Sequence, residues 1–309
     1  NFSVTADGTP TSVEYTNPCS LKSSTETDLS VTSFYFQDQV DVSDNLIVVL
    51  GGRHDTFDVK VSDIKNGTSA ARKDTRFSPR MGVIYKPRDS MSIYYSYSEG
   101  FSPRSGEQYK SLSGGSPGSG ETLRPDYFEN MELGVKVDLS SDLSLTAAYF
   151  DSEQTVATRD SVTGETNEIV GLQVDGLELE VKGKVTDKMS VVFGYTSMDG
   201  KTSSGGEPRE IPDNMLSLFA TYEVSDKFGW ALGMTKQGES NIGNNKPGLV
   251  LPEYTRVDLA AYYQIGDDLS VQMNIENLTD ELYFPHSHST HQASVGEPFN
   301  MRISIRKTF

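Results

Sequence analysis

Long apolar runs are missing from this chain. Its 309 residues have a mean hydropathy of -0.45, and the longest uninterrupted aliphatic stretch is 46–50. A transmembrane helix needs about 20 consecutive apolar residues, so the sequence excludes a membrane crossing by helix. A transmembrane strand needs only about 9 to 11 residues of alternating character, so low hydropathy leaves a membrane β-protein open.

Positive charge and cysteine are also scarce. The net charge of -17 disfavours a nucleic-acid partner, because phosphates require a basic surface. The acidic surface has two interpretations, a solvated exterior or acidic loops that hold divalent cations. Cys19 is the only cysteine, so no disulfide closes within the chain and no cysteine-based metal site exists. No signal peptide opens the sequence and Asn1 is not an initiator, so we expect a mature piece or a fragment, with any partner of Cys19 lying before residue 1.

Aromatic residues and glycine are plentiful, with 15 Tyr, 14 Phe and 27 Gly, which suits short strands and loops better than packed helices. Apolar and polar residues alternate with a period of two in many segments, as in a strand whose two faces meet different surroundings. In the last segment, one face carries Phe299, Met301, Ile303, Ile305 and Phe309. The alternation predicts thirteen strands, near 28–40, 44–60, 74–86, 90–101, 124–138, 142–157, 167–184, 188–201, 210–223, 227–238, 252–264, 268–277 and 298–309.

The connections between the predicted strands alternate in length. Every second one is a tight polar turn, as in DVSD, KPRDS, LSSD, VTDK, VSDK and IGDD, and the others are long and rich in Gly, Ser, Asn and Pro. Outer-membrane barrels have short periplasmic turns and long outer loops, whereas a soluble sandwich has no reason to alternate. Aromatic residues near many strand ends fit the girdles of such a barrel. The sequence therefore predicts an all-β, antiparallel transmembrane β-barrel.

Thirteen strands cannot close such a barrel by themselves. Single-chain bacterial barrels have even strand numbers, and an open edge in lipid leaves backbone groups unpaired. We therefore expect an upstream part of the barrel that this sequence lacks. Residues 1–27 are predicted to be the remnant of an extracellular loop, and residues 28–309 the C-terminal part of a single barrel domain.

Several segments from about Tyr35 to Phe309 resemble the C-terminal barrel half of TonB-dependent siderophore receptors, particularly the ferric-catecholate type. They are FYFQDQVDVSDNLIVVLGGRHD, FSPRMGVIYKPRDSMSIYYSYSEGFSP, LRPDYFENMELGVKVDL and LPEYTRVDLAAYYQIGDDLSVQMNIENLTDELYF. Two positions depart from the family pattern. His54 stands where Tyr is commoner, and Phe299 stands where the family usually has Arg.

The resemblance implies a 22-stranded barrel with a plug in its lumen, of which this chain would supply strands ten to twenty-two without the plug. It implies the outer membrane of a Gram-negative bacterium, TonB-dependent uptake of a ferric siderophore as the transported ligand, and no covalent cofactor. The implied partners are the missing plug and early strands, the TonB-ExbB-ExbD system, outer-membrane lipid and lipopolysaccharide, and the barrel assembly machinery. That machinery reads a terminal aromatic residue, here Phe309, as an insertion signal.

Two loops carry candidate ligand contacts. Ferric catecholates are anionic and planar, so a pocket for them needs cations and aromatic faces. The loop at 101–124 offers Phe101, Arg104, Tyr109 and Lys110. Solvated loop residues without a ligand are the alternative.

The late loop holds three of the four histidines, His286, His288 and His291. The resemblance places this loop over the binding pocket, so the histidines are expected to contact the siderophore. Two alternatives remain open, a metal ion held by the imidazoles and a polar loop without a ligand. No resident metal site is predicted.

No catalytic constellation stands in a credible context, so the chain is not expected to be an enzyme. Alternative functions are a receptor for haem, cobalamin or another metal chelate, or a passive porin-type barrel. Charges on the predicted lumen face are expected to pair with one another or with the plug, namely Arg80, Glu132, Glu178, Glu180, Arg256, Asp258 and Arg302.

Overall fold

The computed structural model describes residues 24–65, 67–102, 126–159, 166–243, 248–287 and 292–309, with the side chains of all but 156–159 and 166–169. All regular secondary structure in these ranges is β, and no helix in them is long and apolar enough to cross a membrane. The strands are β1 (Thr25–Ser43), β2 (Leu46–Asp63), β3 (Thr68–Arg88), β4 (Met91–Ser102), β5 (Asp126–Asp138), β6 (Leu143–Arg159), β7 (Thr166–Thr186), β8 (Met189–Thr202), β9 (Asn214–Ser225), β10 (Phe228–Gln237), β11 (Ser240–Asn241), β12 (Val250–Leu251), β13 (Tyr254–Gln264), β14 (Leu269–Glu276), β15 (His286–Ser287), β16 (Ala293–Ser294) and β17 (Asn300–Lys307).

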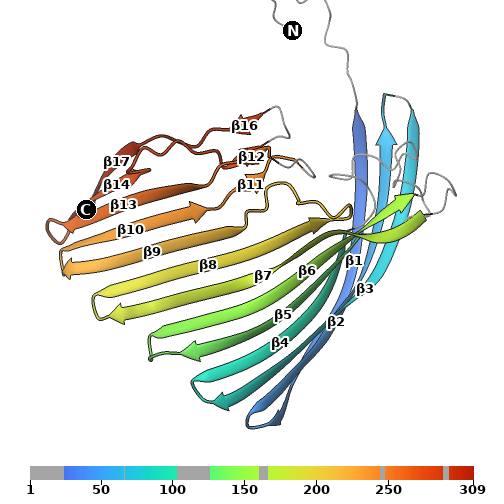
Figure 1. Cartoon of the computed structure of the whole chain (residues 1–309), viewed down its shortest axis with the longest axis horizontal. Helices are drawn as coiled ribbons and strands as arrows, with labels where there is room; N and C mark the ends of the chain where they lie inside the picture. Colours follow the sequence, from blue (N-terminus) through green and yellow to red (C-terminus); the bar gives the residue numbers. More distant parts are fainter. Residues whose placement is uncertain (1–23, 66, 103–125, 160–165, 244–247, 288–291) are drawn as a thin grey trace, which may run out of the picture.

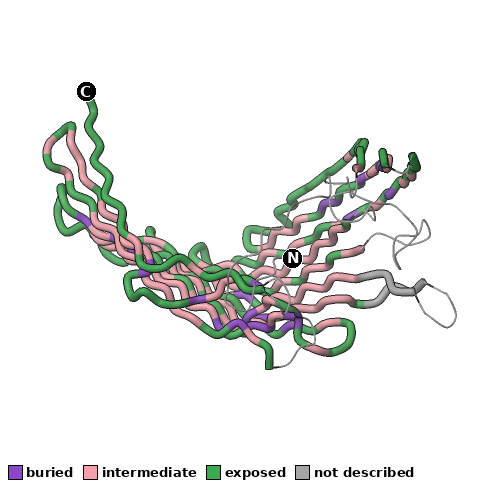
Figure 2. The backbone as a smooth tube through the Cα atoms, turned by 90° about the horizontal axis from the view of Figure 1, so that it is seen from above, coloured by how far each residue is buried: buried purple, intermediate pink, exposed green. Residues whose placement is uncertain are grey.

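Thirteen of these strands form one sheet, in the order β1-β2-β3-β4-β5-β6-β7-β8-β9-β10-β13-β14-β17. Each strand pairs antiparallel with its neighbour, from β1 with β2 to β14 with β17. The sheet curves into an open trough with the tight turns along one rim (Figure 1 and Figure 2). The prediction of thirteen antiparallel strands is confirmed. The small hairpins β11–β12 and β15–β16 lie outside this sheet and were not predicted.

One face of the sheet carries exposed apolar side chains. Ile305, Leu177 and Leu133 are 71%, 60% and 55% exposed. Burying a side chain of this kind stabilises a fold by roughly 1.5–3 kcal/mol, so a water-soluble chain would cover such a face. Within the described residues no second layer covers it. The face therefore suits a hydrocarbon surrounding, and the opposite face, with Glu132 and Arg302, suits a lumen.

The strands differ in height on the loop side of the sheet. β3 and β7 run for 21 residues, whereas β14 and β17 run for 8. Since a tilted strand crosses a bilayer in about 9–11 residues, the tall strands continue beyond the membrane and the short ones end near its border.

Some strand ends differ from the predicted ones. β1 begins at Thr25, inside the segment expected to be a loop remnant, and residues 1–23 with Cys19 lie outside the described residues. β3 begins at Thr68 rather than near 74, because its polar first residues pair with β2 through the backbone. β17 ends at Lys307, and the Thr308 N–H still donates to the Asp268 carbonyl at 2.9 Å, so Phe309 lies just past the last strand. Its ring is fully exposed, with the Lys307 Nζ 5.6 Å from the ring centroid.

Candidate ligand-contacting site

The wall of the trough splits between β3 and β4. Their ladder runs from Arg88 and Met91 at the turn only to Arg80 and Ser98. Further toward the loops, β3 stays paired with β2 as far as Thr68, and β4 stays paired with β5. The strands β1–β3 consequently stand upright beside the rest of the sheet (Figure 1).

A cavity of about 680 Å³ lies at the base of this split, and we call it the β3–β4 cleft. Phe57 of β2 and Phe101 of β4 meet there edge to face, with ring centroids 5.4 Å apart. The exposed Arg80 also lines the cleft. Among the described residues, its guanidinium has no ion-pair or hydrogen-bond partner. The cleft thus offers an aromatic corner and an available cation on one surface.

A second arginine of the cleft is already engaged. The Arg53 Nε donates to both carboxylate oxygens of Asp55, at 2.8 and 2.9 Å, and its Nη2 donates to the Ser33 Oγ at 2.7 Å. Ser33 in turn donates to Asp55, which is 6% exposed. Because this carboxylate neutralises Arg53, Arg80 is the cation of the two that remains free to meet an anion.

Arg76 fastens the upright strands to the rest of the wall above the cleft. Its Nη2 lies 2.8 Å from the Glu99 Oε2, and the Tyr97 hydroxyl donates to the other oxygen of Glu99 at 2.8 Å. The Arg76 Cζ lies 3.3 Å from the ring centroid of Tyr127, close enough for a cation–π interaction. Side chains from β3, β4 and β5 therefore meet where the β3–β4 backbone pairing has ended. We call these four residues the Arg76 clasp.

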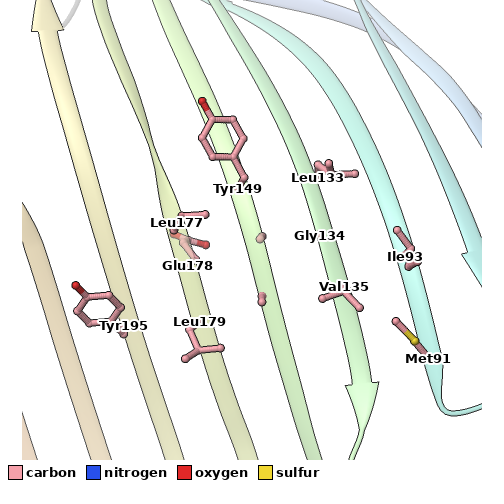
Figure 3. A pocket seen from close by; sticks show the side chains of 12 residues that line it. Met91, Ile93, Leu133, Gly134, Val135, Tyr149, Leu177, Glu178, Leu179 and Tyr195 are labelled. Carbon is pink, nitrogen blue, oxygen red and sulfur yellow. The ribbon is translucent and has the colours of Figure 1, made fainter.

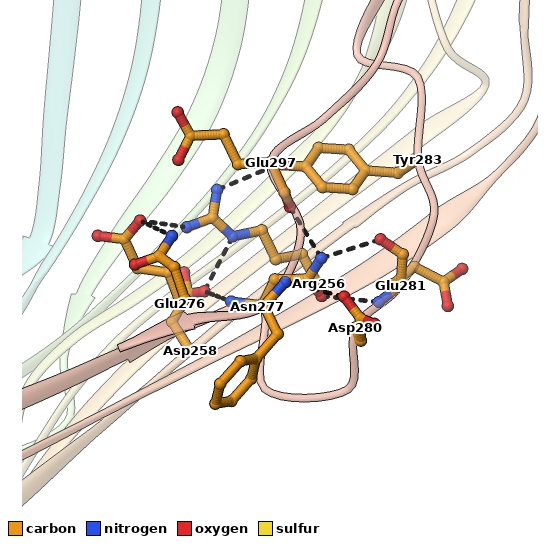
Figure 4. Close-up of polar contacts among 10 residues, drawn as sticks. Arg256, Asp258, Glu276, Asn277, Asp280, Glu281, Tyr283 and Glu297 are labelled. Carbon is orange, nitrogen blue, oxygen red and sulfur yellow. Dashed lines mark hydrogen bonds and ion pairs between the residues drawn. The ribbon is translucent and has the colours of Figure 1, made fainter. Parts of the chain in front are cut away.

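The last long connection is tied down by Asn277, which is 1% exposed. Its Nδ2 donates to the carbonyls of Glu281 and Glu297 at 2.9 and 3.0 Å, and its Oδ1 accepts from the Glu281 N–H at 2.9 Å (Figure 4). Its own N–H donates to the Asp258 Oδ1 at 2.8 Å. Asn277 has φ 50°, and Asn adopts this left-handed conformation more readily than other non-glycine residues. The asparagine therefore satisfies the connection's backbone groups in a place closed to water.

Arg256 extends this network toward the lumen. Its Nε lies 2.9 Å from the Asp258 Oδ1, and its Nη1 donates to the Tyr283 hydroxyl at 3.2 Å (Figure 4). The Glu276 carboxylate lies 3.8 Å from its Nη2. The expected pairing of lumen-face charges is confirmed for Arg256 and Asp258.

Glu210 joins the same connection to two other loops. Its carboxylate accepts from the Ser287 N–H at 2.5 Å, and its own N–H donates to the Asn241 carbonyl at 2.9 Å. Its φ of 57° places it in the left-handed region, which costs on the order of 1 kcal/mol or more for a non-glycine residue. Three loops thus meet at Glu210, two of them through its side chain and its backbone N–H, and the exposed His286 adjoins this junction.

The structure places only part of the predicted site. Phe101 lies in the β3–β4 cleft and His286 beside the Glu210 junction, far along the sheet from one another. The described residues hold no group of three or more His, Cys, Asp or Glu side chains that could bind a metal ion. The remaining predicted residues lie outside the described ranges, namely Arg104, Tyr109, Lys110, His288 and His291.

Sequence reasoning did not single out Phe57 as a residue of the cleft, because Phe57 sits in a strand with ordinary alternation. It noted Arg80 only as a lumen charge, and Asn277 only as part of a segment that resembles the family. A signal existed for Asn277, because Asn and Asp tolerate the left-handed conformation in turns, and Asn277 and Asp280 both adopt it. No sequence signal pairs Glu210 with Ser287, since 77 residues separate them.

The chain matches the family model described as "TonB dependent receptor-like, beta-barrel" over residues 1–278. It is 28% identical over 298 residues to the "Probable TonB-dependent siderophore receptor PiuA" of Acinetobacter baumannii, covering 86% of this chain and 39% of that protein. It is 30% identical over 296 residues to the ferripyoverdine receptor of Pseudomonas aeruginosa, covering 89% of this chain and 35% of that one. The chain therefore spans well under half the length of these two relatives.

Among solved structures, the chain resembles the ferric-catecholate import receptor Fiu of E. coli K12 in its closed form. The TM-score is 0.83 at 19% identity, over 98% of this chain and 48% of that one. At this identity the likeness shows a shared fold. The thirteen-stranded sheet of this chain therefore has the fold of about half of the Fiu chain.

Proposed function

This chain belongs to the TonB-dependent receptors, as part of their outer-membrane β-barrel in a Gram-negative bacterium, and we propose that it serves the uptake of a ferric siderophore. Its relatives named above are siderophore receptors, which supports a transport role rather than catalysis. In this proposal the chain supplies later barrel strands and loops that contact the ligand. The plug, the early strands and the TonB-ExbB-ExbD system act with it.

One observation supports a particular class of ligand, the ferric catecholates. In the β3–β4 cleft, the available Arg80 guanidinium lies on the same surface as the Phe57–Phe101 pair. A ferric catecholate presents negative charge and flat aromatic rings, so it can accept hydrogen bonds from the arginine while a ring packs on the phenylalanines. A catecholate siderophore therefore fits this surface better than a neutral ligand does. His286, with His288 and His291, is proposed to contact the ligand from the loop side.

The test uses the full-length receptor that carries this chain. Arg80→Ala and Phe101→Ala are compared with Arg88→Ala, which removes a cation at a tight turn on the opposite rim. Loss of a hydrogen bond to a charged group weakens binding by roughly tenfold or more. We expect such a rise in the Kd of a radiolabelled ferric catecholate for Arg80→Ala, a smaller rise for Phe101→Ala, and none for Arg88→Ala. Unchanged binding of the catecholate by both cleft variants would contradict the catecholate assignment. If the receptor binds haem, cobalamin or another chelate and no ferric catecholate, that assignment is also wrong.

A further inference from the structure

The two parts of the wall overlap at the Arg76 clasp instead of continuing in one plane. Figure 3 shows Ile93 of β4 among the side chains of the outward, apolar face, and Tyr97 and Glu99 follow on that face at even spacings. Arg76 lies on the opposite, lumen face of β3, four residues before Arg80. The clasp therefore joins the lumen face of one part to the outward face of the other, where the β3–β4 backbone ladder has already ended.

The closed clasp leaves one polar group unsatisfied. The Arg76 Nε is buried and, among the described residues, has no hydrogen-bond partner. Opening the clasp would return this N–H to water and recover the cost of burying it. Arg76 would also keep a carboxylate nearby, since Asp55 of β2 is its direct cross-strand partner. The net free energy that keeps the clasp closed is therefore small.

Glu99 belongs both to the clasp and to the β3–β4 cleft. Its carboxylate pairs with Arg76, and the residue lines the cleft together with Arg80. Glu129 lies directly opposite Glu99 in the β4–β5 ladder, and like charges in such positions are destabilising. Within the described ranges, the ion pair recorded for these two carboxylates is the one with Arg76. An anion that enters the cleft beside Arg80 therefore adds to the negative charge around Glu99.

We propose that the Arg76 clasp is a gate on the β3–β4 cleft, opened by an anionic ligand whose charge drives Glu99 away from Arg76. The inference rests on the proposed function, because the anion is the ferric catecholate. Repulsion between the ligand and Glu99 weakens the ion pair, and the upright strands β1–β3 then separate from β4 and β5 above the cleft. Since the ligand favours the open state, it binds that state more tightly than the closed one. Weakening the clasp therefore increases the affinity for the ligand.

The first test measures the Kd of the full-length receptor for a radiolabelled ferric catecholate. Glu99→Gln keeps acceptors for Arg76 and for the Tyr97 hydroxyl but removes the charge. We expect the Kd to fall about fivefold, because both the repulsion and the closed state are weakened. Tyr97→Phe removes one hydrogen bond that holds Glu99 in the clasp, so it should lower the Kd about twofold and serves where Glu99→Gln impairs assembly.

Glu153→Gln is the control for the loss of a negative charge. Glu153 is half-exposed and lies in the same row of the sheet as Glu99, two strands away and outside the cleft lining. Because solvent screens a charge at that distance, its Kd should match that of the unaltered receptor. Loss of a purely structural side chain would raise the Kd, so an unchanged or higher Kd in both clasp variants would overturn the gate.

The second test measures the opening itself. Spin labels are carried by non-natural amino acids at two exposed positions on either side of the split, Thr75 of β3 and Ser102 of β4. The gallium complex of the same catecholate replaces the ferric one, because ferric iron is paramagnetic and disturbs the labels. We expect the ligand to shift the distance between the labels to longer values, and Glu99→Gln to show part of this shift without ligand.

The two measurements separate the gate from the proposed function. Binding of the catecholate with an unchanged distance between the labels would overturn the gate and leave the proposed function in place. If the unaltered receptor binds no catecholate, the proposed function is wrong and the gate is wrong with it. Tighter binding by the clasp variants together with the longer distance would support both.

Discussion

Two regions of the sheet support the chain on the loop side in different ways. They are the upright strands β1–β3 and the short strands β13, β14 and β17. Both regions must support chain beyond the bilayer on the loop side. In the first, the backbone ladder itself continues, with β2 and β3 paired from Leu46–Tyr85 to Asp63–Thr68. In the second, the ladder between β14 and β17 covers only the crossing, and a folded connection takes over.

The means of attachment differ accordingly. The upright region is joined to its neighbour by half-buried side chains, the Arg76 clasp. The short region is held by Asn277, a fully buried side chain that satisfies main-chain groups. A buried group left unsatisfied costs more than an exposed pair that water can replace. The comparison therefore predicts that removing Asn277 lowers the free energy of unfolding more than removing Arg76 does.

The largest effect is expected for Asn277→Ala. The carbonyls of Glu281 and Glu297 and the Glu281 N–H lose their partner in a site closed to water, which costs about 2–3 kcal/mol in the free energy of unfolding. Urea unfolding of the full-length receptor in lipid vesicles measures this loss. Asn274→Ala, in β14 three residues before Asn277 and half-exposed, is the control. Equal free energies of unfolding for the two variants would contradict the claim that the buried Asn277 anchors the short region.

A smaller effect is expected for Arg76→Gln. It removes an ion pair whose side chains are 20% and 17% exposed, together with the contact to Tyr127, at a cost of about 1–2 kcal/mol. The loss should be local, so hydrogen exchange of residues 55–63 and 68–76 should accelerate while β13–β17 remains unchanged. Acceleration spread evenly over both regions would show that the upright strands are not held separately.

Glu210→Gln sharpens the comparison within the short region. Gln keeps an acceptor for the Ser287 N–H but loses the charge. The substitution is therefore expected to lower the local stability by about 1 kcal/mol. Amide exchange at Ser287 should rise several-fold, and the global unfolding midpoint should stay nearly constant. A global shift as large as that of Asn277→Ala would place the main anchor at Glu210 instead.

The smallest effect is expected for Lys236→Ala. Lys236 of β10 pairs at 3.4 Å with Glu253, which directly precedes β13, but the two side chains are 42% and 67% exposed. Exposed pairs contribute about 0–1 kcal/mol, so the unfolding midpoint should barely move. A loss comparable to that of Arg76→Gln would contradict the view that burial sets the order of these effects.

The sheet was predictable from the sequence because lipid and lumen impose opposite demands on alternate residues. Segments such as 268–277 and 142–157 therefore carry the two-residue period, and the strands observed there are β14 and β6. Above the membrane both faces meet water or other loops, and the period fades. The first residues of β3, Thr68 to Lys73, were accordingly missed.

The candidate site was only partly predictable, for a similar reason. Phe101 was identified from its residue type at the start of a loop. Its partner Phe57 lies two strands away, and the split that brings them together depends on where β3 and β4 stop pairing. Contacts such as Glu210 with Ser287 depend on how three loops pack, and alternation carries no information on that. The roles of Arg104, Tyr109, His288, His291 and Phe309 stay predictions.

Iron uptake by whole cells tests the central claim most directly. Uptake of radiolabelled iron is measured from a panel of ferric siderophores in a strain that lacks the gene and in the complemented strain. We predict that uptake from at least one catecholate is lost, is restored by the full-length receptor, and ceases when TonB is absent. Undiminished uptake from every siderophore in the deletion strain would contradict the account.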